Sequence, residues 1–196
     1  MPIRAVFVDR DGVINEKAPE GDYVKCWQEF KFLPRAQEAI QALKQHDFTP
    51  IVVSNQRGIA LGRMTDADLA EIHCRMLAEL EKVGARIPPI YYCPHDLGAC
   101  QCRKPELGMF LHAQRDLPGL DFSQAFVVGD SVAEMQSAER LGSRKVLISG
   151  PRSSEPVLLA AQHIEADYVA GSLWEATTNY ILAGGLLKGA RLGRNR

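Results

Sequence analysis

Short runs of β-branched and aromatic residues alternate with amphipathic helical patterns along most of this chain. The apolar runs span residues 5–9, 50–54, 90–93, 125–130 and 145–149, and the helical patterns span 36–46, 66–84, 108–117 and 132–142. Strands that are apolar throughout are buried on both faces, as in a parallel sheet that lies between two layers of helices. The sequence therefore predicts an α/β fold with a doubly wound, mostly parallel, Rossmann-like sheet.

The expected helix ends agree with this pattern. Thr65 stands where it can cap the 66–84 helix, with Asp68 three residues later. Gly84 and Gly142 stand where the second and the fourth helical patterns are expected to end.

Length and charge narrow the kinds of partner. A chain of 196 residues suits one domain, which we expect over 1–183, followed by a flexible basic tail over 184–196. Lysine and arginine number 23 against 24 acids, so the net charge of −1 predicts neither nucleic acid nor a membrane as a partner. No segment approaches the roughly 20 apolar residues that span a bilayer, which favours a cytoplasmic protein. We expect a monomer that acts on a small molecule.

Polar side chains follow the apolar runs at the points where the strands should end. They are Asp9, Asp11, Ser54, Lys104 and Asp130. In open α/β sheets ligands bind beyond the carboxyl ends of the strands, so these side chains are expected at one edge. Three gathered carboxylates need a cation, and hard oxygen ligands favour Mg²⁺. Together with a lysine and a hydroxyl group, such an ion makes a cradle for a phosphoryl group.

A second constellation is the segment "CPHDLGACQCRKP", residues 93–105. Cys93, His95, Cys100 and Cys102 supply three thiols and an imidazole, the donor set of a tetrahedral structural Zn²⁺ site. A disulfide is the alternative, and a reducing compartment disfavours it. With four protein ligands such a zinc ion keeps no place for a reactive water, so we expect it to brace the chain.

The quoted strand ends resemble a known family. The segments "DRDGVIN" and "GDSVAE", with Ser54 and Lys104, are similar to the four motifs of haloacid dehalogenase superfamily phosphatases, over residues 5 to about 148. The resemblance implies that Asp9 is the nucleophile, that Asp11 protonates the leaving oxygen and then activates water, and that Ser54 and Lys104 hold the phosphoryl oxygens. It also implies that Mg²⁺ is held by Asp9 and Asp130 and by the backbone carbonyl of Asp11.

The role implied for Asp11 requires two protonation states. Its carboxyl group must carry a proton in the first step and be ionised in the second. Burial and neighbouring carboxylates can raise the pKa of a carboxyl group enough for this change. We therefore expect these two effects to act on the pKa of Asp11.

The spacing of the motifs leaves no room for a cap domain. Selectivity is then expected from the loop over 15–27, which includes Asp22 and Tyr23, and from the Cys/His loop. "YYCPH", "CRKP" and "NQRGIALGRMT" resemble the zinc-containing branch with the phosphatases of heptose 1,7-bisphosphate and of histidinol phosphate. That resemblance implies substrate contacts from Asn55, Gln56, Arg57 and Arg103.

The heptose branch is the more similar one, which implies removal of the 7-phosphate of D-glycero-D-manno-heptose 1,7-bisphosphate. That reaction would serve nucleotide-activated heptose for lipopolysaccharide or another surface polysaccharide. Histidinol phosphate is the alternative substrate, but it is a cation that Arg57 and Arg103 would repel. The chain departs from the family pattern at Arg57, at Ser131 and at Glu134, where serine, lysine and aspartate respectively are seen.

Two other classes of function remain open at this point. A phospho-receiver domain also carries carboxylates, a hydroxyl group and a lysine at strand ends, but its acidic pair is adjacent and its phosphorylated aspartate lies on a later strand. The spacing in "DRDG" on the first strand disfavours that class. A zinc-based interaction module is the other alternative, and Mg²⁺-driven phosphate release after zinc chelation would distinguish it from an enzyme.

Overall fold

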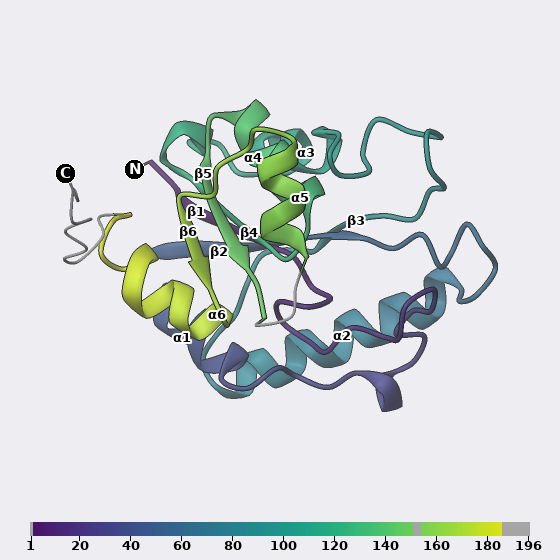
Figure 1. Ribbon diagram of the computed structural model, residues 1–196. Coiled ribbons are helices and arrows are strands. Elements are labelled where there is room, and N and C mark those ends of the chain that lie inside the picture. Colours follow the sequence, from purple (N-terminus) through teal and green to yellow (C-terminus); the bar gives the residue numbers. More distant parts are fainter. Residues whose placement is uncertain (1, 151–153, 186–196) are drawn as a thin grey trace.

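The structure is a computed structural model that describes residues 2–150 and 154–185. Its centre is a six-stranded sheet in the order β3-β2-β1-β4-β5-β6, and every neighbouring pair of strands is parallel (Figure 1). The strands are β1 (Arg4–Val8), β2 (Phe48–Asn55), β3 (Tyr91–Cys93), β4 (Phe126–Gly129), β5 (Arg144–Ile148) and β6 (Tyr168–Ala170). The predicted parallel α/β sheet is confirmed.

Helices cover both faces of the sheet (Figure 1). On one face lie α1 (Ala36–Gln45), α2 (Asp66–Lys82) and α6 (Leu173–Ala176), and on the other lie α3 (Gly108–Asp116), α4 (Val132–Leu141) and α5 (Glu155–Ala161). Two short 3₁₀ helices, η1 (Trp27–Glu29) and η2 (Phe122–Gln124), and a π-helical turn, η3 (Thr177–Ile181), complete the described elements. Between residues 9 and 104 the chain forms only the loops and elements of this layered domain, so no cap domain is inserted there.

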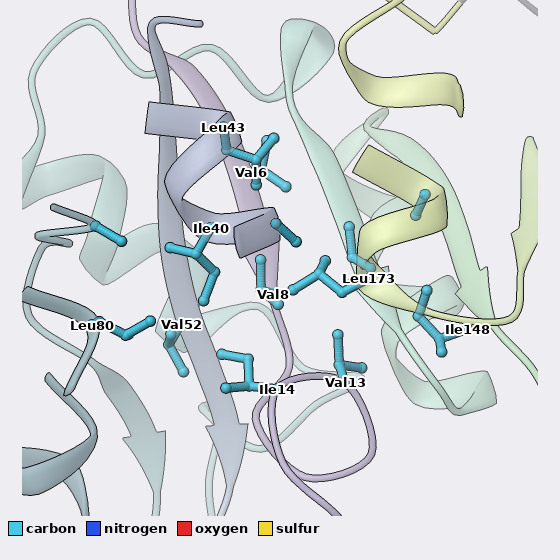
Figure 2. Packing of buried hydrophobic residues seen from close by; sticks show 14 of the residues in the cluster. Val6, Val8, Val13, Ile14, Ile40, Leu43, Val52, Leu80, Ile148 and Leu173 are labelled. Atoms are coloured by element: carbon cyan, nitrogen blue, oxygen red, sulfur yellow. The ribbon is translucent and has the colours of Figure 1, made fainter. Parts of the chain in front are cut away.

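The two larger apolar cores, one on each side of β1, follow from the alternation of side chains along the strand. In β1, Val6 and Val8 pack into the core beneath α1 and α2, whereas Ala5 and Phe7 pack into the core beneath α3. Figure 2 shows Val6 and Val8 among side chains of α1, of the neighbouring strand β2 and of α6. These four β1 side chains are fully buried, which is why the run from Ala5 to Val8 is apolar without interruption.

The expected helix caps at Thr65 and Gly142 are confirmed. Thr65 accepts a hydrogen bond from the backbone N–H of Asp68, whose side chain accepts one from the Thr65 N–H. Gly142 adopts the left-handed conformation at the end of α4. The helix over 66–84 ends at Lys82, before the left-handed Gly84. No element was expected beyond residue 149, where the structure has α5, β6 and α6.

The strand order reverses between β1 and β4. From β1 the chain continues outward through β2 to β3, and it then returns to β4 and continues outward through β5 to β6 on the other side. Such a reversal opens a crevice at the carboxyl ends of the two strands. Asp9 follows β1 and Asp130 follows β4, and the Asp9 N–H donates to the carbonyl of Val128 at 2.9 Å. The fold therefore brings the two acids together.

The predicted tail over 184–196 lies outside the described residues, apart from Gly184 and Gly185. Among the described helices, none is long and apolar enough to cross a membrane.

Candidate active site

Lys104 lies at the centre of the polar cluster beyond the strand ends. Its Nζ lies 2.8 Å from Asp9 Oδ1 and 2.7 Å from Glu134 Oε1, and it donates to the carbonyl of Val53 at 2.9 Å. The side chain is only 1% exposed. Burial opposes its charge, but the two carboxylates outweigh burial and raise the pKa of Lys104. The lysine is therefore a fixed positive charge beside Asp9.

The side chains of three acids, Asp9, Asp130 and Glu134, lie together. One carboxylate oxygen of each lies within 4.8 Å of the others. Burial is the largest influence on Asp9 and raises its pKa to about 7, although Lys104 acts in the opposite direction. Burial likewise raises the pKa of Asp130 to about 6, against the influence of Lys17. Oxygen ligands whose ionised forms are disfavoured without a further cation suit a hard divalent ion such as Mg²⁺.

Asp11 faces a different environment from Asp9. Its two carboxylate oxygens accept hydrogen bonds from Arg10, Asn15 and Gln56, at 2.8 to 3.3 Å. Burial raises the pKa of Asp11, but Arg10 and the amide donors outweigh burial and lower it overall. Burial acts on the pKa of Asp11 as expected, but the adjacent Arg10, which is itself fully buried, and the amide donors decide the net direction.

Arg10 is held from its other side by α2. Its Nη1 lies 3.2 Å from Nε2 of His73, and because a guanidinium only donates, that ring nitrogen must be the acceptor. Burial and the positive charge of Arg10 lower the pKa of His73 to about 3. His73 is therefore neutral at physiological pH.

This depressed pKa predicts a loss of stability in acid. Above the unfolded-state pKa of 6.5 both states are neutral at His73, and as the pH falls toward 3 only the unfolded state takes up the proton. Between pH 7 and pH 5 the wild type should lose about 2 kcal/mol more unfolding free energy than His73→Gln. Urea unfolding at both pH values measures the difference, and equal losses in the two proteins would contradict it.

The residues after β2 are fixed by polar contacts. Ser54 Oγ accepts from Gln56 Nε2 at 2.7 Å, and both side chains are 1% exposed. The side chain of Asn55 accepts from the backbone N–H of Lys104 and donates to its carbonyl, at 3.0 and 3.1 Å. This pair of hydrogen bonds joins the end of β2 to the segment that carries the lysine. Ser54 thus lies next to the side-chain network of Asp11.

The other expected substrate residues lie on loops. Arg57 forms an ion pair with Asp96. The Nη1 atom of Arg103 is buried without a hydrogen-bond partner among the described residues. Asp22 forms an ion pair with Lys25. The ring of Tyr23 packs against Gly58, where a side-chain Cβ atom would lie 2.9 Å from the ring.

The predicted Cys/His cluster is assembled. Its four ligand atoms lie within 4.8 Å of one another, and the closest sulfurs are 3.2 Å apart, far beyond the roughly 2.05 Å of a disulfide bond. Thiolates about 2.3 Å from one tetrahedral zinc ion are separated by about 3.8 Å, which these thiols approach. The four donor atoms and their short mutual distances are therefore consistent with a zinc site. The backbone N–H of Arg103 points to Cys100 Sγ at 3.4 Å, so the cluster contacts the segment that carries Lys104.

Three residues around the catalytic aspartates were not expected as site residues. Glu134 was noted only as a departure from a pattern, yet it contacts Lys104 and also accepts from the N–H of Ser131. The S-x-x-E signature of a capping box could have placed its carboxylate at the start of α4, beside Asp130. Lys17, 2.7 Å from Asp130 Oδ2, and the buried Arg10 had no comparable signal.

Comparisons with known proteins bear on this geometry. The family model "Polynucleotide kinase 3 phosphatase" matches residues 5–155. D-glycero-beta-D-manno-heptose-1,7-bisphosphate 7-phosphatase of Escherichia coli is 36% identical over 180 residues, covering 87% of this chain and 90% of that protein. D-glycero-alpha-D-manno-heptose-1,7-bisphosphate 7-phosphatase of Mycobacterium bovis is 34% identical over 171 residues, with 87% of each chain covered. The chain belongs to the heptose 1,7-bisphosphate phosphatase family of haloacid dehalogenase-like phosphatases.

A solved structure of this family carries the ligands that the site suggests. The D,D-heptose 1,7-bisphosphate phosphatase of B. bronchiseptica, complexed with magnesium and phosphate, has a TM-score of 0.78 and 31% sequence identity, and the match covers 90% of this chain and 96% of that one. The chain is thus a haloacid dehalogenase-type phosphatase, a phosphomonoester hydrolase.

Proposed function

We propose that the protein removes the 7-phosphate of D-glycero-D-manno-heptose 1,7-bisphosphate through an aspartyl-phosphate on Asp9. The observation that carries the reaction is the Asp9 carboxylate, held 2.8 Å from a buried lysine and beside two further carboxylates. The names of the relatives supply the substrate class. This step would provide heptose for nucleotide activation and surface polysaccharide in the cytoplasm, by a monomer whose catalytic domain spans 1–183.

The first step attaches the phosphoryl group to Asp9. An oxygen of that carboxylate attacks phosphorus, the bond to the leaving oxygen breaks, and Asp11 gives that oxygen its proton. Ser54 and Lys104 bind the oxygens of the transferring group. Asp9, Asp130 and the backbone carbonyl of Asp11 would hold Mg²⁺, which supplies positive charge where the negative charge of the phosphoryl group gathers.

The second step returns the nucleophile. Water attacks the aspartyl-phosphate and Asp11, now ionised, takes a proton from it. Arg10, Asn15 and Gln56 stabilise the ionised carboxylate of Asp11, so the arrangement in the structure suits this second step. The same five hydrogen bonds keep the carboxylate oriented while its proton is absent.

A distal phosphate suits the arginines near the site. Within the described part of the chain the buried Nη1 atom of Arg103 has no hydrogen-bond partner. The pKa of Asp96 is lowered by the backbone N–H of Leu97 and also by the charges of Arg57 and Arg103. Guanidinium groups bind phosphate oxygens in a fork, so a substrate with a second phosphate can satisfy the free donor. We propose that these arginines select the substrate together with Asn55 and Gln56, which follow β2, and with Asp22 and Tyr23 of the loop over 15–27.

A phosphate-release screen with Mg²⁺ tests the proposal. Its substrates are the α and β anomers of heptose 1,7-bisphosphate, histidinol phosphate and an oligonucleotide with a 3′-phosphate. We expect the highest kcat/KM for one heptose anomer. A higher kcat/KM for histidinol phosphate or for the oligonucleotide would overturn the assignment of the substrate while leaving the phosphatase chemistry in place.

Zinc in the Cys/His cluster should act as a brace for Arg103 and Lys104. In Cys102→Ser we expect zinc loss and a KM raised about tenfold, because a small displacement of positioned groups weakens substrate binding. Metal analysis and steady-state kinetics measure both effects. Cys74→Ser is the matched control, since Cys74 is exposed and lies outside the cluster. Zinc loss with unchanged KM and stability would show that the cluster braces nothing.

A further inference from the structure

A chain of side chains leads from α2 to the carboxylate of Asp11. His73 accepts from Arg10 at 3.2 Å, and Arg10 in turn donates to both oxygens of Asp11 at 2.8 and 2.9 Å. Gln56 closes the group, since it accepts from Arg10 at 3.3 Å and donates to Asp11 at 2.8 Å. Arg10 is fully buried and His73 is 8% exposed, so water has little access to their contact.

We propose that His73 is a positioning residue for the acid–base group of this phosphatase, acting through Arg10. The inference rests on the proposed role of Asp11 in proton transfer. His73 does not touch the substrate; its ring nitrogen fixes the rotation of the guanidinium. The guanidinium orients Asp11 in both steps, because Arg10 donates to each oxygen and, in the first step, the oxygen that does not carry the proton still accepts from it. Without that acceptor, Arg10 Nη1 is left buried and unsatisfied, and the guanidinium turns toward another partner.

The polar character of position 73 supports this role over simple packing. The neighbouring buried residues of α2, Leu69, Ile72, Met76 and Leu80, are all apolar and fill the core beneath the sheet. A histidine in that row costs the removal of a polar ring from water unless the ring is bonded. Its bond goes to Arg10, 63 positions away in the sequence, and the ring also lies edge-on to Tyr92.

The proposal predicts a dependence on the leaving group. In the first step the bond between phosphorus and the leaving oxygen breaks, phosphorus bonds to Asp9, and the Asp11 proton goes to the leaving oxygen. An alkoxide from a sugar phosphate needs that proton, whereas the nitrophenolate of p-nitrophenyl phosphate leaves without it. Because kcat/KM reports steps up to the first irreversible one, it isolates this proton transfer from the later attack of water.

The test compares kcat/KM for p-nitrophenyl phosphate with that for the alkyl phosphate that the enzyme hydrolyses fastest. His73→Leu should lower kcat/KM for the alkyl phosphate about 10- to 100-fold, and for p-nitrophenyl phosphate less than about threefold. His73→Gln should recover most of the loss, because its amide oxygen can accept from Arg10. Met76→Ala is the matched control, since Met76 is a fully buried apolar neighbour on α2, and it should affect both substrates alike.

Two outcomes separate the inference from the proposed function. If Asp11→Asn lowers kcat/KM far more for the alkyl phosphate but His73→Leu lowers both substrates equally, the positioning role of His73 is overturned. If Asp11→Asn itself shows no preference between the leaving groups, the acid role of Asp11 is overturned, and the inference fails with it.

Discussion

Asp9→Asn should abolish phosphate release while the fold stays intact. An amide oxygen cannot form the aspartyl-phosphate, so we expect kcat to fall at least about 10³-fold. The variant should be as stable as the wild type or more so, because burial already raises the pKa of Asp9 to about 7 and thus disfavours its charge. Phosphate release and thermal unfolding in EDTA measure the two effects.

The control for this variant is an aspartate outside the site. Asp121 caps η2 by accepting from Ser123, a role that asparagine also fills, so Asp121→Asn should change neither quantity. Acid-quenched wild type should carry covalent phosphate after mixing with substrate and Asp9→Asn should carry none. Phosphate release at the wild-type rate by Asp9→Asn would exclude Asp9 as the nucleophile.

The central sheet could be predicted because burial dictates its sequence. β1, β2 and β4 lie between two helical layers, so their central residues 5–8, 51–53 and 126–128 are apolar without interruption. The region after residue 149 gives no such signal. β6 lies at the edge of the sheet, and its three apolar residues form too short a run to be recognised as a strand.

The residues of the candidate site that directly follow a strand could also be predicted from the sequence. The carboxyl ends of parallel strands share one edge, so the backbone alone brings Asp9, Ser54 and Asp130 together. The contacts of Arg10 and Lys17 depend on how far long side chains reach and which way they turn, and no periodic pattern in the sequence records this. The lowered pKa of Asp11 escaped prediction for that reason, since its cause is the conformation of Arg10.

Lys104→Met should both inactivate and destabilise the protein. Lys104 is the cation between Asp9 and Glu134, and all three residues lie in the buried centre of the cluster. Methionine fills a similar volume but leaves two buried carboxylates facing each other, which should cost about 3–5 kcal/mol of unfolding free energy. kcat should fall at least about 10³-fold, because the charge that attracts the phosphoryl oxygens is gone. Urea unfolding in EDTA and phosphate release measure these changes.

The two effects of Lys104→Met have separable causes, which a second substitution can reveal. Glu134→Gln removes one of the repelling charges, so the double variant Lys104→Met/Glu134→Gln should regain much of the stability and none of the activity. Mg²⁺ should stabilise Lys104→Met more than the wild type, because the carboxylate group of Asp9, Asp130 and Glu134 has then lost its internal cation. If neither Glu134→Gln nor Mg²⁺ restored stability, the loss would come from packing, and electrostatic balance would not be what holds the centre of this site together.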